Sequence, residues 1–215
     1  MKLIFEGHDY RYAVEQSLLA FFPSERPVYD GEDPNTAQVR LTLDGQTAHA
    51  YTELAVDGKT SRGASQIDVS TAQDDYERER LLQRAVKLSF FEAARSLTGV
   101  TPAWGALTGI RPAKLAAGLL EEGKSEAETD AILRDTYFVS ESRRALCLPC
   151  AKAGLEAKKG LKKDEISLYT GIPFCPTRCA YCSFVSNSVE KSFHLVEPYL
   201  HKLSTLLHLI FIIMS

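Results

Sequence analysis

The sequence lacks an excess of positive charge, a secretory leader and a long apolar run. Its formal net charge is −3, whereas nucleic-acid-binding surfaces are usually basic, so no nucleic-acid partner is predicted. Residues 1–8 (MKLIFEGH) reach an acidic residue after three apolar ones, which is not the apolar core of a signal peptide. The most apolar stretch, residues 206–215, is shorter than the about 20 residues of a membrane-spanning helix. We therefore expect a cytoplasmic protein with no membrane partner.

Cysteine is scarce as well, with five residues in the chain. An odd number without a leader argues against a disulfide framework and for a reducing compartment. The hydrophobic content of 45% and the charged content of 25% are ordinary for a globular protein. A length of 215 residues allows one or two domains.

Residues 1–160 show the pattern of an α+β domain, a small antiparallel meander followed by helices. Two runs alternate apolar and polar residues about a turn at Asp44-Gly45, whereas Gly63 and Ser65 weaken a third run. The strands are expected at residues 2–6, 37–43, 47–56 and 64–70. The helices are expected from Asp9 to about Phe22 and at 72–98, 112–122, 125–136 and 140–159.

Capping signals delimit several of these helices. Asp9 is a candidate N-cap, and Ser125 with Glu128 is typical of a capping box. Gly99 stands where a left-handed C-terminal cap is expected. Pro149 is expected to break or kink the last helix. A basic linker at residues 158–164 then marks a domain boundary, with the second domain at 161–215.

Cys175, Cys179 and Cys182 follow that boundary in a C-x3-C-x2-C run. Three thiolates this close together suit a loop around one compact inorganic group. Soft thiolate ligands select zinc, copper(I) or an iron–sulfur cluster. Structural zinc usually takes four ligands from two separated pairs, whereas a compact triad leaves one position open. Because iron–sulfur clusters ordinarily take four cysteines, three favour a cluster with one open iron.

The run resembles the signature of the radical S-adenosylmethionine (SAM) superfamily, C-x3-C-x-aromatic-C. Residues 168–175 (LYTGIPFC) are similar to the strand that opens the cluster loop in oxygen-independent coproporphyrinogen III oxidases. With LTGIRP at 107–112, they most resemble the HemZ-type branch of coproporphyrinogen dehydrogenases. The resemblance implies that residues 165–169 are the first strand of a radical SAM (β/α) barrel and that the cluster loop follows it.

The resemblance also implies a chemistry. Cys175, Cys179 and Cys182 would each bind one iron of a 4Fe-4S cluster, and SAM would bind the fourth iron. An electron from the cluster would cleave SAM to a 5′-deoxyadenosyl radical. Tyr181 and Tyr169 would lie beside SAM. The implied reaction is the oxidative decarboxylation of coproporphyrinogen III to protoporphyrinogen IX, with a tetrapyrrole substrate and a flavodoxin- or ferredoxin-like electron donor.

Two departures from the family pattern keep other readings open. Gly171 replaces the usual histidine, and Phe184 stands where characterised oxidases have a fourth cysteine. Heme chaperones with the same cluster loop share that phenylalanine, so a heme-binding protein is the alternative. A third reading is a zinc-binding interaction module that also uses Cys147 and Cys150, although we favour these two as incidental cysteines.

Chain length sets a further expectation. Only 33 residues follow Cys182, whereas a full (β/α)8 barrel uses about 250 residues. We therefore expect a truncated chain that holds one barrel unit and an atypical tail after about residue 198. Such a chain is expected to fold in its first domain, to be poorly ordered over 165–215 and to lack activity alone.

Overall fold

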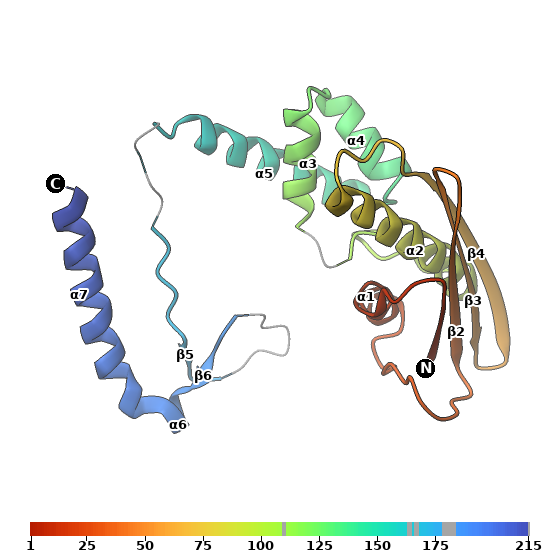
Figure 1. Ribbon diagram of the computed structural model, residues 1–215, viewed down its shortest axis with the longest axis horizontal. Helices are drawn as coiled ribbons and strands as arrows, with labels where there is room; N and C mark the ends of the chain where they lie inside the picture. The colour runs from red at the N-terminus through yellow and green to blue at the C-terminus, as the bar shows by residue number, and fades with distance from the viewer. Residues whose placement is uncertain (109–110, 163–164, 166–167, 178–183, 215) are drawn as a thin grey trace. The chain divides into compact units, whose positions relative to one another are not determined.

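The computed structural model describes residues 1–108, 111–162, 165, 168–177 and 184–214 (Figure 1). The chain divides into two compact units, Met1–Leu161 and Lys162–Ser215. The boundary predicted at residue 160 lies beside this division. Each unit is described by itself below.

The first unit contains a four-stranded sheet in the order β1-β2-β3-β4. β2 and β3 pair antiparallel, as do β3 and β4, but β1 pairs parallel to β2. The predicted antiparallel meander is therefore wrong for the first strand. The connection between β1 and β2 contains a helix, and such a crossover lets β2 run in the same direction as β1. The α+β class is confirmed. The strands are β1 (Lys2–Glu6), β2 (Thr36–Asp44), β3 (Thr47–Val56) and β4 (Lys59–Asp68).

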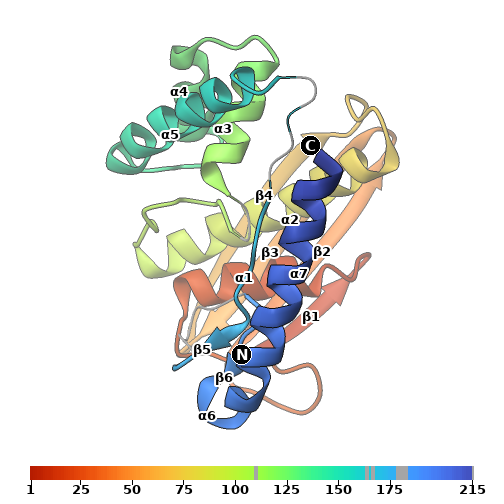
Figure 2. The ribbon, with the colours of Figure 1, turned by 90° about the vertical axis from the view of Figure 1, so that its left-hand side faces the viewer.

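Two helices, α1 (Arg11–Phe21) and α2 (Asp75–Thr98), lie on the same side of this sheet (Figures 1 and 2). The N-cap of α2 is Asp74, whose side chain accepts a hydrogen bond from Glu77 N at 2.7 Å. Its C-cap is Gly99, which has a φ of 70° as predicted for a left-handed cap. The core between the helices and the sheet consists of buried apolar side chains that include Val14, Leu18, Val39, Leu54, Val86 and Phe90.

The predicted N-cap of α1 is wrong. The cap is Tyr10, which makes no side-chain capping bond. The Asp9 carboxylate instead accepts a hydrogen bond from Arg11 Nε at 2.7 Å. Because this ion pair is exposed, it contributes little to stability, and the helix depends on burial of its apolar face.

β4 packs unusually close to α2. Ser61 Oγ donates to Ala93 O at 2.8 Å, and Ser65 Oγ donates to Ala85 O at 2.6 Å. Between them lies Gly63, where an added Cβ would stand only 2.2 Å from a backbone oxygen of the helix. These small residues alternate along one face of the strand. β4 therefore begins at Lys59, before the residue predicted, and includes the two residues that had weakened the prediction.

Three helices follow in the same unit: α3 (Pro112–Glu121), α4 (Glu126–Asp135) and α5 (Glu141–Lys159). The predicted capping box of Ser125 and Glu128 is confirmed in both directions. α5 continues through Pro149, so of the expected break or kink the break is wrong, and a kink stays a prediction. These helices share a second buried cluster, formed by Leu107, Ala116, Leu133, Val139, Cys147 and Ala151.

The second unit contains short elements and one long helix. The expected strand at 165–169 is not seen, since Glu165, Leu168 and Tyr169 adopt no regular structure and residues 166–167 lie outside the described part. Among the residues described in this unit, the two-residue strands β5 and β6 form the sheet. No described helix is long and apolar enough to cross a membrane. The elements are β5 (Phe174–Cys175), β6 (Asn187–Ser188), α6 (Val189–Ser192), a 3₁₀ turn (Phe193–Leu195) and α7 (Val196–Met214).

Candidate functional site

The predicted cluster loop leaves the sheet at Cys175, the last residue of β5. Phe174 and Cys175 pair in parallel with Asn187 and Ser188 of β6. Asn187 N also donates to Pro173 O at 2.7 Å. Backbone pairing thus holds the two ends of the segment 176–186 side by side. A segment closed in this way suits a loop that surrounds a bound group.

An aromatic contact connects this pair of strands to α7. The rings of Phe174 and Tyr199 lie edge to face with their centroids 5.5 Å apart. The Tyr199 hydroxyl donates a hydrogen bond to Gly171 O. α7 therefore fixes the Gly-Ile-Pro-Phe run that leads into Cys175.

Gly171, the departure from the family's histidine, lies against Tyr169. A Cβ at Gly171 would stand 3.3 Å from Tyr169 Cε1, which is a tight contact. Tyr169 is 80% exposed, so its ring is accessible to a ligand. A larger residue at 171 would push this ring aside.

Only part of the predicted site can be placed. Cys175 carries a free, half-buried thiol. Cys179, Cys182 and Tyr181 lie outside the described residues. Within the described residues no group of three potential metal ligands occurs, so the three-thiolate site stays a prediction.

Cys147 and Cys150 lie in different environments on α5. Cys147 is 2% exposed in the second buried cluster, and burial raises the pKa of its thiol. Cys150, one helical turn later, is exposed. Reactive cysteines are at least partly exposed, whereas buried structural ones are inert. The arrangement supports the interpretation of Cys147 as a core residue.

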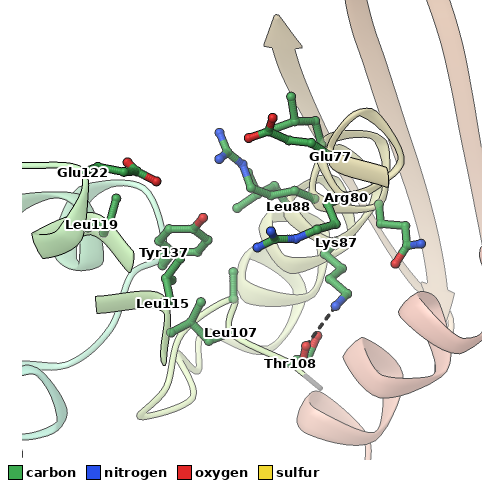
Figure 3. A pocket seen from close by; sticks show the side chains of 14 residues that line it. Glu77, Arg80, Lys87, Leu88, Leu107, Thr108, Leu115, Leu119, Glu122 and Tyr137 are labelled. Carbon is green, nitrogen blue, oxygen red and sulfur yellow. Dashed lines mark hydrogen bonds between the residues drawn. The ribbon is translucent and has the colours of Figure 1, made fainter. Parts of the chain in front are cut away.

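Sequence reasoning missed a pocket in the first unit (Figure 3). It has a volume of about 320 Å³ and lies between α2, the segment before α3, and α3 itself. Lys87 Nζ donates to Thr108 O there at 2.9 Å. The available signal was the spacing of Arg80, Arg84 and Lys87, which places three cations on one face of a predicted helix.

Comparison with known proteins identifies a relative. The oxygen-independent coproporphyrinogen-III oxidase-like protein HemZ of Bacillus subtilis (strain 168) is 31% identical over 195 residues, which is 88% of this chain. The resemblance to the HemZ-type branch is confirmed. The match with HemZ supports a coproporphyrinogen oxidase-like radical SAM family for the chain.

The match with HemZ extends into both units of this chain but covers less than half of HemZ. Because Met1–Leu161 is about three quarters of the chain, a match over 88% includes part of the second unit. The chain spans 39% of the length of HemZ. No protein-family model matches the chain, and no solved structure matches it.

Proposed function

We propose that the chain belongs to a radical SAM oxidoreductase of heme and porphyrin biosynthesis. Its reaction would be the oxidative decarboxylation of coproporphyrinogen III to protoporphyrinogen IX. One observation carries the proposal: in a chain homologous to HemZ, a Gly-Ile-Pro-Phe run leads into β5, and Cys175, the first of the three cysteines, is the last residue of that strand. A tetrapyrrole substrate and a flavodoxin- or ferredoxin-like electron donor belong to the same proposal.

The residues present suit the cofactors as far as they are described. Cys175 is free and partly accessible, unlike the buried Cys147, so its sulfur can be reached by a metal. With Cys179 and Cys182 it would hold a 4Fe-4S cluster, which would supply the electron that cleaves SAM. The exposed ring of Tyr169 and the ring of Tyr181 would orient SAM beside the cluster.

The test is anaerobic reconstitution of the full chain with iron and sulfide, followed by reduction. The EPR spectrum is then recorded with and without SAM, and 5′-deoxyadenosine is measured. We expect SAM to change the spectrum, because one iron without a cysteine ligand is open to it. A reconstituted cluster whose spectrum ignores SAM would refute the radical SAM assignment.

A heme-binding role is the second candidate, and Phe184 favours it. This residue occupies the position of the oxidases' fourth cysteine, and its side chain is 70% exposed. Titration with hemin separates the two roles. Stoichiometric heme binding in a chain that does not respond to SAM would support a chaperone, whereas SAM cleavage without heme binding would support the oxidoreductase.

A further inference from the structure

The pocket of the first unit combines an apolar wall with a charged wall. Figure 3 shows Leu115, Leu119 and Tyr137 on the side opposite α2, with Leu107 below them. α2 supplies the basic residues of the other wall. The pocket volume of about 320 Å³ lies at the small end of the range for ligand pockets, about 300 to 1,000 Å³. The space therefore suits a small ligand with an apolar body and a charged end.

Three cations line α2 at this pocket: Arg80, Arg84 and Lys87. They lie on one helix face, where neighbouring like charges repel each other. Among the residues that the structure describes, none of the three forms an ion pair.

Two acidic residues, Glu77 and Glu122, also line the pocket. Glu77 Oε2 accepts a hydrogen bond from Gln73 N at 2.8 Å and so helps to cap the start of α2. With two acids against three bases, the lining keeps one positive charge in excess. An anion would be attracted, and a cation would be repelled.

Two buried polar atoms at the pocket have no hydrogen-bond partner within the described part of the chain: Arg84 Nε and Thr108 Oγ1. The Arg84 guanidinium lies 5.8 Å from the centre of the Tyr137 ring. The described contacts of Lys87 Nζ include one hydrogen bond, to Thr108 O, and burial lowers the pKa of Lys87. Buried donors are normally satisfied, so this wall has an unmet need for an acceptor.

We propose that this pocket binds a small amphipathic oxyanion, a carboxylate or phosphate group attached to an apolar body. The oxyanion accepts hydrogen bonds from Arg84 and Lys87 and faces the charge of Arg80, because guanidinium and ammonium groups match carboxylate and phosphate oxygens. The apolar body packs against Leu115 and Leu119. The pocket uses no residue of the cysteine loop, so the inference is independent of the proposed function.

Calorimetric titration of the full chain tests the proposal with four probes. They are 3-phenylpropionate, phenyl phosphate, the uncharged 3-phenylpropionamide and inorganic phosphate. We expect one or both aromatic anions to bind, and to bind at least about tenfold more tightly than the amide and than phosphate alone, where tenfold corresponds to about 1.4 kcal/mol. The stronger of the two aromatic anions identifies the oxyanion. Its affinity falls as salt is added.

Variants of α2 locate the binding. The double variant Arg80→Gln with Arg84→Gln is expected to lose at least about tenfold in affinity. The matched control is Arg78→Gln, on the same helix but not in the pocket lining, which keeps wild-type affinity. Thermal unfolding checks that each variant is folded. If the double variant does not fold, Leu119→Asn, which changes the apolar wall, takes its place and is expected to weaken binding.

Three results would overturn the proposal. The first is that neither aromatic anion binds saturably. The second is that the amide binds as tightly as the anions, because the basic residues would then play no part. The third is that the double variant, folded, binds as wild type does, because the ligand would then lie elsewhere.

Discussion

Gly63→Ala tests the close packing of β4 on α2. An alanine Cβ at this position would lie 2.2 Å from Ser89 O and 2.4 Å from Ala93 N. Both are backbone atoms of a helix, so they cannot rotate away as a side-chain end would. The helix must therefore move off the strand, which loosens the packing of Phe90 and its neighbours in the main core.

The size of the effect follows from two opposing terms. Overpacking of a core costs about 1–3 kcal/mol, and a clash with helix backbone belongs at the upper end of that range. Alanine also stiffens the unfolded chain, which recovers about 0.4–1 kcal/mol. We expect the free energy of unfolding to fall by about 2 kcal/mol. Urea unfolding followed by far-UV circular dichroism measures it, with an unchanged slope showing that stability alone changed.

Gly118→Ala is the matched control. Gly118 lies inside α3, and apart from the neighbouring backbone of the helix itself no described atom comes within 4 Å of a Cβ built there. Alanine in an open helix position is expected to raise stability by about 0.5–1 kcal/mol. The same substitution thus has opposite signs at the two sites. An unchanged or higher urea midpoint for Gly63→Ala would refute the close-packing argument.

Three further predictions concern charges and thiols of the first unit. Asp130→Ala should lower the free energy of unfolding by about 1.5–3 kcal/mol, because it removes the partner 2.8 Å from Arg144, whose side chain is 12% exposed; an unchanged melting curve would contradict this. The hydrogen bond from the amino terminus lowers the pKa of Glu25 below 4.5. Glu25 therefore adds stability above its unfolded pKa, and this stability is lost as the pH falls through the lowered folded pKa. In the Glu25→Gln variant, the urea unfolding midpoint should depend less on pH over that range. Iodoacetamide should label Cys150 much faster than Cys147 in the native chain, because Cys147 is buried with a raised pKa; equal rates by peptide mass spectrometry would argue against its burial.

Local signals predicted two helix ends correctly. The capping box at Ser125 and the left-handed Gly99 depend on a few adjacent residues, so their geometry can be read from the sequence. Pro149 does not end its helix, although an interior proline removes a backbone hydrogen bond. α5 continues past it to Lys159, with Cys147 before it and Ala151 after it buried.

Features that depend on distant segments were predicted less well. The direction of β1 depends on the crossover through α1, and its short apolar run gives no sign of direction. Gly63 and Ser65 weaken the sequence-based prediction of β4, whereas in the structure their small size lets α2 pack close to that strand. The pocket was missed because its walls come from separate segments, around Arg84, Thr108 and Tyr137.

In the candidate site, too, the local motif was predictable and the pairing of distant residues was not. The motif around Cys175 was sufficient to predict the relationship to HemZ. The pairing of β5 with β6, which closes the ends of the loop, was not predictable, because it joins two residues on either side of the segment 176–186. The roles of Cys179, Cys182 and Tyr181 stay predictions.

The proposed function depends on an iron–sulfur cluster bound by the cysteine loop. The most direct measurement counts iron and acid-labile sulfide after anaerobic reconstitution of wild type, Cys175→Ala and the control Cys150→Ala. We predict about four irons and four sulfides per chain in wild type and in the control, and loss of the cluster in Cys175→Ala. A Cys175→Ala variant that retains the wild-type iron and sulfide content would contradict the account.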